Sequence, residues 1–401
     1  MSHIVVIGAG QAGSALVAKL RALDFTGKIT LIGEEGVPPY QRPPLSKKYL
    51  LGEMEVERLY LRPESFYQDN GIDLLLSDTA VSIDRADKVV VAGGKAIAYD
   101  QLALTTGSVP RRLPGSIGGT LEGVHVVRTL ADVDEMAPAC VEGARVLIIG
   151  GGYIGLEAAA VAASRGLNVT LVEMADRILQ RVAAPETSDF FRDLHKGHGV
   201  DMREGVGLTR LLGEGHVTGA ELSDGTVLDV DFVIVGVGIT PATELAEAAG
   251  VTIDNGIAVD EFGRTSDPVI WSAGDCASFP YKGNRMRLES VQNAIDQAEL
   301  VAANMLGAEK AYAPYPWFWS DQYDVKLQIA GLNTGYDRVV VRNDGDGQSH
   351  WYYAGETLLA VDAMNDPRAY MIGKRLLEMG KSPSPDLIAD PATELKPLLK
   401  A

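Results

Sequence analysis

Residues 145–173 read RVLIIGGGYIGLEAAAVAASRGLNVTLVE, and this stretch decides the fold. It opens with an apolar run that predicts a buried strand, passes through a glycine-rich turn, and enters a segment whose apolar residues recur at helical spacing. Gly166 predicts the end of that helix, and a second apolar strand ends at Glu173. The order of strand, turn, helix and strand predicts a parallel βαβ unit.

The same order occurs at the start of the chain, in residues 3–34. The strand HIVVIG and the turn GAGQAG precede a helix whose apolar face holds Ala12, Leu16, Leu20 and Leu23, and the strand KITLIGE follows. Each turn has the spacing GxGxxG, in which missing side chains let the backbone approach a pyrophosphate. Two complete fingerprints predict two bound dinucleotides rather than two ordinary glycine turns, and the usual pair is a nicotinamide with a flavin.

An acid ends the second strand of each unit, where it can accept hydrogen bonds from ribose hydroxyls. Because a carboxylate binds a free 2′-hydroxyl but repels a 2′-phosphate, Glu173 favours NADH over NADPH. The fingerprint residues predicted to hold the two dinucleotides are Gly8, Gly10, Ala12, Gly13 and Glu34 in the first unit and Gly150, Gly152, Tyr153, Ile154, Gly155 and Glu173 in the second.

The length of 401 residues is too great for one ordinary core, so we expect several domains. Residues 102–107 and 231–238 are apolar runs that resemble buried strands at points where the chain crosses between domains. We therefore expect an α/β fold with two Rossmann-like dinucleotide-binding domains, the second inserted in the first, and a C-terminal α+β domain. The predicted divisions are 1–109 with 241–313 for the FAD-binding domain, 110–240 for the NADH-binding domain and 314–401 for the C-terminal domain.

From residue 313 onward the pattern changes to the alternation that is typical of strands. Val325, Leu327 and Ile329 alternate with polar residues, the segments DRVVVRN and WYYAGETLLAVDAM predict further strands, and a terminal helix around MIGKRLLEMG is expected to close the domain. Upstream of them, residues 291–305 predict a long helix with one apolar face.

Charge and composition oppose several classes of protein. The net charge of −18 opposes nucleic acid or an anionic membrane as the main partner. The two cysteines suggest neither a disulfide framework nor a thiolate metal site, and no apolar run reaches the roughly 20 residues of a membrane span. We expect a soluble, cytoplasmic protein. His195 and His198 lack acid or thiol company, so we expect no metal site and interpret them as part of a solvated helix face.

A series of motifs carries a family resemblance. In chain order they are GAGQAG, RPPLSK (42–47), TTGSVPR (105–111), GGGYIGLE (150–157), SAGDCA (272–277), ESVQNA (289–294) and PWFWSDQY (316–323). With them the chain resembles the oxygenase-coupled, NADH-dependent ferredoxin reductases, the group of putidaredoxin reductase and rhodocoxin reductase, within the glutathione-reductase-like flavoproteins. The resemblance covers nearly the whole chain, and RPPLSK together with PWFWSDQY is specific to this branch.

The resemblance implies FAD and NADH as cofactors and assigns further residues to them. Asp275 would accept from the ribityl chain, and the stretch around Glu289 and Val291 would begin a helix beside the flavin pyrimidine edge, where a positive helix end favours an electron-rich ring. The other implied FAD positions are Arg42, Lys47, Val81, Gly107, Arg128, Gly274 and Trp319, and those along NADH are Glu157, Arg181 and Gly238.

Three of these residues are implied in catalysis, namely Lys47, Glu157 and Trp319. An ammonium near flavin N5, paired with Glu157, would place the nicotinamide and stabilise negative charge on the reduced ring. The alternatives are a solvated Lys47, a first-turn helix acid at Glu157 and a turn residue at Asp275. Trp317 and Trp319 should share one face of an extended segment, either against the isoalloxazine ring or as a link between the third domain and the first.

No cysteine pair lies where a disulfide reductase needs one, and Cys276 is expected to be a small packed residue, so electrons should leave the flavin directly. We expect an FAD-dependent NADH:ferredoxin reductase whose 2Fe–2S ferredoxin serves a monooxygenase or dioxygenase. The alternatives are a rubredoxin or quinone-type reductase of the same fold, or a redox interaction protein that resembles apoptosis-inducing factor. An acidic ferredoxin needs a basic patch, for which the candidates are Lys47, Lys48, Arg285, Arg287 and Lys326.

Overall fold

The computed structural model describes residues 2–345 and 347–400. The chain divides into two compact units, and each is assembled from separate stretches of sequence. The first unit comprises Met1–Arg42, Met54–Val109 and Ile239–Pro314, and the second comprises Pro43–Glu53, Pro110–Gly238 and Tyr315–Ala401. The segment Pro43–Glu53 thus belongs to the second unit although it lies inside the first predicted domain. The three predicted domains and their boundaries stay a prediction.

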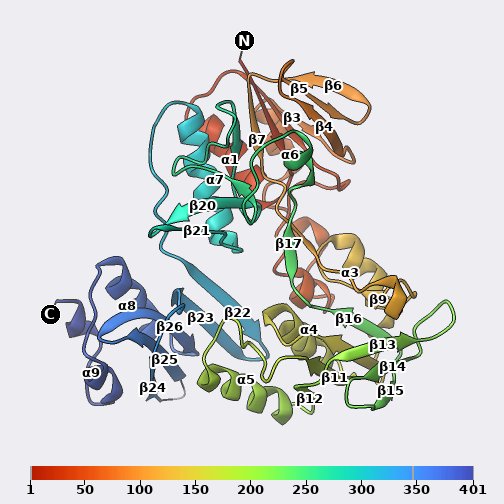
Figure 1. Cartoon of the computed structure of the whole chain (residues 1–401), viewed down its shortest axis with the longest axis vertical. Helices are drawn as coiled ribbons and strands as arrows, with labels where there is room; N and C mark the ends of the chain where they lie inside the picture. Colours follow the sequence, from red (N-terminus) through yellow and green to blue (C-terminus); the bar gives the residue numbers. More distant parts are fainter. Residues whose placement is uncertain (1, 346, 401) are drawn as a thin grey trace. The chain divides into compact units, whose positions relative to one another are not determined.

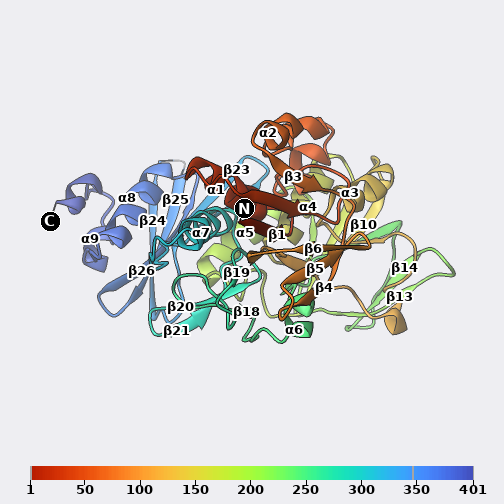
Figure 2. The ribbon, with the colours of Figure 1, turned by 90° about the horizontal axis from the view of Figure 1, so that it is seen from above.

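A parallel sheet of order β19-β7-β1-β2-β3 forms the centre of the first unit. Its strands are β1 (His3–Ile7), β2 (Lys28–Ile32), β3 (Ile72–Leu75), β7 (Gln101–Leu104) and β19 (Ile270–Ser272). Helices α1 (Gln11–Ala22) and α7 (Val291–Met305) lie side by side on one face (Figures 1 and 2), where Ile4 and Val6 pack. Val5 and Ile7 pack on the other face with Val90. Because both faces are covered, the strands are apolar throughout rather than alternating.

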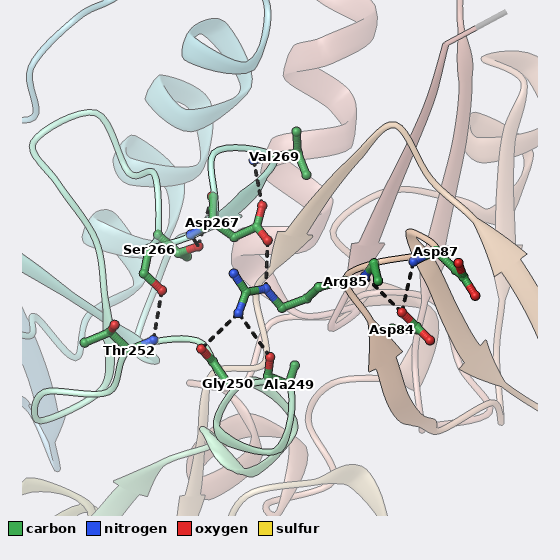
Figure 3. A network of polar contacts seen from close by, with 11 residues as sticks. Asp84, Arg85, Asp87, Ala249, Gly250, Thr252, Ser266, Asp267 and Val269 are labelled. Carbon is green, nitrogen blue, oxygen red and sulfur yellow. Dashed lines mark hydrogen bonds and ion pairs between the residues drawn. The ribbon is translucent and has the colours of Figure 1, made fainter.

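Smaller elements complete the first unit. They are an antiparallel sheet of β4 (Ala80–Asp84), β5 (Val89–Ala92) and β6 (Lys95–Ala98), a sheet of β18 (Ile257–Ala258), β20 (Ala277–Tyr281) and β21 (Asn284–Met286), and the helices α2 (Glu64–Asp69) and α6 (Glu244–Ala248). Figure 3 shows how Arg85, after β4, joins stretches far apart in sequence: its Nε donates to Asp267 at 2.7 Å and its Nη1 donates to the Gly250 carbonyl at 3.1 Å.

The chain passes to the second unit within β8 (Ser108–Pro110) and returns at β17 (Ile239–Pro241). The second unit holds another parallel sheet, of order β12-β11-β10-β16-β9, against which α4 packs. Its elements are β9 (Val124–His125), α3 (Leu130–Met136), β10 (Arg145–Ile149), α4 (Tyr153–Ser164), β11 (Asn168–Glu173), α5 (Pro185–Gly197), β12 (Asp201–Glu204) and β16 (Phe232–Val235), with an antiparallel sheet of β13 (Leu208–Leu212), β14 (Gly219–Leu222) and β15 (Val227–Asp229).

An antiparallel sheet of order β22-β23-β26-β25-β24 follows in the same unit. Its strands are β22 (Trp317–Gln322), β23 (Val325–Gly331), β24 (Arg338–Asp344), β25 (Gly347–Ala354) and β26 (Thr357–Met364). Helices α8 (Pro367–Glu378) and α9 (Pro385–Ala389) pack against these strands (Figure 2). The prediction that α8 ends the fold is wrong, because Ser384 caps a further helix that begins at Pro385.

The predicted fold class, with two parallel βαβ cores and a C-terminal α+β part, is confirmed. One helix face differs from its prediction: Leu23 is the C-cap of α1 and is 41% exposed, so the apolar face ends at Leu20. None of the helices within the described residues has the length and apolar character that a membrane crossing needs.

Candidate functional site

The first fingerprint combines two glycines that the fold requires with one that faces open space. A Cβ on Gly8, at φ +109°, would lie 2.2 Å from the Thr105 carbonyl oxygen, and one on Gly13 would lie 2.0 Å from that of Gly8. A Cβ on Gly10 would meet no atom of the described residues within 4 Å. Gly10 is also the N-cap of α1, so no side chain at this position caps the first N–H groups of the helix. Unpaired helix N–H groups therefore face a cradle that a side chain would fill, and such a cradle fits a pyrophosphate.

The second fingerprint has the same geometry. Gly150 has φ +107° and a Cβ there would lie 2.4 Å from the Gly236 carbonyl oxygen, while a Cβ on Gly155 would lie 2.0 Å from that of Gly150. Gly152, the N-cap of α4, again faces space that the described part of the chain leaves open. The structure thus presents two dinucleotide cradles, one in each unit.

The two predicted ribose acids are placed differently. Glu173 accepts from the Gly151 N–H at 2.7 Å and from the Ala175 N–H at 2.8 Å, so it braces the glycine turn as well as marking the end of β11. Glu34 is exposed just after β2. Its neighbour Glu35 accepts from Arg42 at 2.7 Å, a pairing that fixes Arg42 and that the fingerprint spacing alone does not reveal.

The other residues predicted to contact FAD in the first unit lie on several of its elements. Asp275 accepts from Ser108 Oγ at 3.1 Å, and its carbonyl accepts from Arg287 at 2.9 Å. Arg287 also pairs with Glu289 at 2.8 Å, next to the Ser290 N-cap that precedes Val291. The remaining positions are Gly107 and Gly274, both at positive φ, Ala12, which is buried, and Val81, which is 66% exposed on β4.

Residues assigned to NADH gather in the second unit. A Cβ built on Gly238 would lie 4.0 Å from Arg181 Nη2, so these two positions are neighbours. Tyr153 is half-buried at the start of α4, and its buried hydroxyl has no hydrogen-bond partner among the described residues, whereas Ile154 is 46% exposed. Arg128, which the resemblance assigns to FAD, also belongs to the second unit and lies just before α3, where its backbone N–H donates to Asp132 at 3.1 Å.

A buried ion pair forms the chemical centre of the second unit. Lys47 Nζ lies 3.0 Å from Glu157 Oε1, and the Lys47 side chain is only 16% exposed. Ser46 and Ser320 donate to the same carboxylate at 3.3 and 2.8 Å. The predicted pairing of Lys47 with Glu157 is present, and neither a solvated lysine nor a simple first-turn acid describes it. Asp321, for which the sequence suggests no role, has its Oδ2 3.7 Å from Lys47 Nζ.

Opposing effects set the charge of Glu157. Burial raises the pKa of its carboxyl group, while the charge of Lys47 and the hydrogen bonds from Ser320, Lys47 and Ser46 lower it. The net direction is upward. Burial thus outweighs the charge of Lys47 and the hydrogen bonds, and Glu157 binds a proton more readily than a solvent-exposed glutamate does.

Trp317 and Trp319 lie next to each other on β22, with ring centroids 5.6 Å apart and planes tilted by 34°. The Lys374 ammonium lies 5.1 Å from the centre of the Trp317 ring, which gives Trp317 a packing role within the C-terminal sheet and α8. Lys47, Arg128 and Trp319 belong to the second unit, whereas the first fingerprint belongs to the first. Their predicted contact with FAD stays a prediction.

The prediction for Cys276 is confirmed, and the prediction for His195 is wrong. Cys276 is buried and its Sγ lies 3.6 Å from the Leu104 carbonyl oxygen, so it is a packed residue as predicted. His195 does not lie on a solvated face: it is 0% exposed and bonds to Gln322. The prediction fails because Gln322 and Tyr323, far along the chain, contact the His195 ring. No cluster of His, Cys, Asp or Glu in residues 2–345 and 347–400 could hold a metal ion.

The proposed basic patch loses some of its members. Lys47 is committed to Glu157, and Arg287 is 12% exposed and paired with Glu289. Arg285 donates to two backbone carbonyls, those of Val259 and Ser278. Lys48, Arg285 and Lys326 are exposed, and of these three Arg285 is held by the two backbone bonds just named.

Comparison with known proteins gives consistent matches over the whole chain. A family profile described as pyridine nucleotide-disulphide oxidoreductase matches residues 2–298, and one described as reductase C-terminal matches residues 317–399. Rhodocoxin reductase of Rhodococcus erythropolis is 42% identical over 98% of this chain and 93% of its own length. Putidaredoxin reductase of Pseudomonas putida is 40% identical over 100% and 97%. The solved covalent putidaredoxin reductase–putidaredoxin complex matches with a TM-score of 0.96 at 39% identity, covering 100% of this chain and 98% of that chain.

Proposed function

Because the chain belongs to the pyridine nucleotide-disulphide oxidoreductase family, we propose that it carries electrons from NADH through FAD to a 2Fe–2S ferredoxin that serves a monooxygenase or dioxygenase. The family resemblance, the oxidoreductase class and the pair of cofactors predicted from sequence are confirmed by the matches. The observation that carries the proposal is the pair of glycine cradles, each at the start of a helix after a buried parallel strand.

The first cradle is the better candidate for FAD. Gly10 and Gly13 at the start of α1 are proposed to hold the pyrophosphate, with Glu34 at the adenosine ribose. Asp275, on the turn before β20, is proposed to accept from the ribityl chain, and the α7 start at Ser290 to face the ring. The remaining proposed FAD contacts are Gly8, Ala12, Arg42, Lys47, Val81, Gly107, Arg128, Gly274, Glu289, Val291 and Trp319.

The second cradle is proposed for NADH. Gly152 and Gly155 would hold its pyrophosphate, and Glu173 would accept from the adenosine ribose. Glu173 is an anion held in place by the Gly151 and Ala175 N–H groups, so a 2′-phosphate at this position would meet a fixed negative charge. This fixed charge supports NADH over NADPH.

When bound, FAD accepts a hydride from the nicotinamide and releases electrons one at a time. One NADH supplies one hydride, two ferredoxins each take one electron, and one proton is released. Lys47 is proposed to stabilise negative charge on the reduced ring, since Glu157 keeps its ammonium in a fixed position. Trp319 is proposed to lie against the ring. Both cysteines are buried and free, so the direct route to a protein acceptor remains the proposal.

The docking surface for ferredoxin is proposed to include Lys48 and Lys326, which are exposed in a chain of net charge −18. Local positive charge steers an acidic partner and fixes its orientation more than it adds affinity. The proposal also places the protein in the cytoplasm, where two unpaired cysteines are common.

The test is a side-by-side assay of electron acceptors. The purified protein should show a flavin spectrum, and NADH should reduce a panel of 2Fe–2S ferredoxins with kcat/KM above that for rubredoxin or a quinone. NADPH should be the poorer donor. A protein without flavin refutes the proposal. A higher kcat/KM with rubredoxin or a quinone than with every ferredoxin would show that the electron acceptor is not a ferredoxin. Slow turnover with every ferredoxin and a long-lived reduced complex would instead favour a redox interaction protein.

A further inference from the structure

A buried chain of hydrogen bonds connects Glu157 to His195 through two side chains of β22. Ser320 Oγ donates to Glu157 Oε1 at 2.8 Å, and Gln322 Nε2 donates to Ser320 Oγ at 3.1 Å. Gln322 Oε1 lies 2.8 Å from His195 Nε2, and the Tyr323 hydroxyl lies 3.3 Å from His195 Nδ1. Ser320, Gln322 and His195 are each 0% exposed. Water is therefore unable to replace their partners without opening the core.

The carboxylate determines the direction of every bond in this chain. A carboxylate only accepts, so the Ser320 hydroxyl must give its single hydrogen to Glu157 and accept from Gln322. The Gln322 amide then presents its oxygen to His195, whose ring must carry its proton on Nε2 and accept at Nδ1 from Tyr323. All donors point toward Glu157, so the dipoles add along the chain with their positive ends facing the carboxylate.

Protonation of Glu157 removes this constraint. A protonated carboxyl group can donate to Ser320, which can then donate to the oxygen of a rotated Gln322 amide. The amide nitrogen would donate to Nε2 of His195, and the ring would carry its proton on Nδ1 and donate to Tyr323. The reversed direction is therefore open to the chain only when Glu157 is protonated, whereas the ionised carboxylate permits one direction alone.

Other charged and titratable groups also face the ends of the chain. Lys47 lies against Glu157, with Asp321 beside it at 3.7 Å from the ammonium. His198 stacks on Tyr323 with ring centroids 3.7 Å apart. Burial lowers the pKa of His195 to about 4, and the charge of His198 acts in the same direction. The His195 ring is therefore neutral near pH 7, as the polarised chain requires.

We propose that Ser320, Gln322 and His195 are positioning residues whose polarised chain keeps Glu157 ionised and couples the tautomer of His195 to the charge of Glu157. Through Glu157 the chain also holds the Lys47 ammonium. The value of a fixed Lys47 ammonium for electron transfer rests on the proposed function, whereas the hydrogen-bond chain itself does not. A purely structural fastening of α4, α5 and β22 would need the contacts but not their direction, so the direction is what the experiments must measure.

The first experiment determines the tautomer of His195 in the wild-type protein as purified, with its flavin. Nitrogen-15 NMR of histidine-labelled protein near pH 7 reports which ring nitrogen carries the proton, and the His195→Gln variant identifies the signal. We expect the Nε2–H tautomer with a bare Nδ1. A ring protonated on Nδ1, or on both nitrogens, overturns the proposal, and the tautomer itself is determined on the wild-type protein.

The second experiment follows the titration of Glu157 by carbon-13 NMR of the carboxyl group. Ser320→Ala should raise the midpoint by about one pH unit, because a hydrogen bond to the charged form is lost, and Ser320→Thr should restore the wild-type value. Gln322→Met does not alter a contact of Glu157, yet it should raise the midpoint by a smaller amount.

A wild-type midpoint in Gln322→Met overturns the coupling, whatever Ser320→Ala does. A midpoint raised equally by Ser320→Ala and Ser320→Thr overturns the role of the hydroxyl. Neither NMR measurement uses NADH or ferredoxin. A wrong electron acceptor and a wrong hydrogen-bond chain would therefore give separate results.

Discussion

Two glycines of the second fingerprint allow binding to be separated from folding. Gly152 has φ −81° and ψ 177°, which any residue adopts, and its Cβ would meet no described atom within 4 Å. A Cβ on Gly155 would lie 2.0 Å from the Gly150 carbonyl oxygen. Gly152→Ala should therefore leave the fold intact and weaken the binding of NAD⁺, whereas Gly155→Ala should destabilise the fold itself.

The expected magnitudes follow from the geometry. A methyl group placed where a pyrophosphate packs acts like overpacking, at about 1–3 kcal/mol, which is roughly a 5- to 150-fold increase in Kd. At Gly155 the clash is with backbone, which must move to restore ordinary contact. A cost of at least about 1–3 kcal/mol lowers the Tm of a unit of this size by roughly 2–12 °C.

Calorimetric titration of the flavin-loaded protein with NAD⁺ measures Kd without turnover, and a thermal scan of the same samples measures Tm. Gly197→Ala is the matched control, because a Cβ there also meets no described atom within 4 Å but lies at the far end of α5. A wild-type Kd for Gly152→Ala would refute the assignment of the cradle. So would a loss of Tm in Gly152→Ala as large as that in Gly155→Ala.

Three further predictions test single residues. Trp319→Phe should leave less tryptophan emission to be recovered on removal of FAD than Trp317→Phe does, because a tryptophan against a flavin is quenched; equal recovery would separate Trp319 from the ring. Glu173→Gln should lower the ratio of kcat/KM for NADH over NADPH by about tenfold, the equivalent of about 1.4 kcal/mol, because a repelling charge is lost, and an unchanged ratio would remove Glu173 from cofactor choice. Burial lowers the pKa of His195 from 6.5 to about 4, so the unfolded chain binds its proton first and stability is lost as pH falls from 6.5 through 4. His195→Gln should lose less stability over that window, by at most about 3 kcal/mol in urea titrations; equal losses would show that the ring does not titrate as described.

The βαβ units are predictable from sequence because their signals are local. In residues 145–173 the strand, the glycine turn, the helical period and the final acid lie within one stretch, and the structure places β10, α4 and β11 there. The same holds for β1, α1 and β2. The long apolar face of residues 291–305 likewise becomes α7. No contact between distant segments is needed to recognise any of these patterns.

The polar centre of the second unit is not predictable in this way, because it depends on contacts between distant segments. His195 and Gln322 are 127 residues apart, and contacts with Gln322 and Tyr323 accompany the burial of a histidine that looks solvated in the sequence. The aromatic residues of PWFWSDQY dominate its pattern, yet Ser320 and Gln322 make the contacts that lead to Glu157. Alternation along β22 puts these two on the face opposite Trp319, and that signal is present in the sequence.

The ion pair of Lys47 and Glu157 explains why a short segment within the first predicted domain belongs to the second unit. Tyr49 donates to Asp134 at 2.7 Å and Arg165 donates to the Leu50 carbonyl at 2.7 Å, so the segment has other attachments to this unit. A buried ion pair is a costly way to add one more, because apolar side chains of similar volume often serve as well or better. The pair and its serine donors are therefore better understood as a device that keeps one cation in a fixed position. That is what a site that develops negative charge during electron transfer requires.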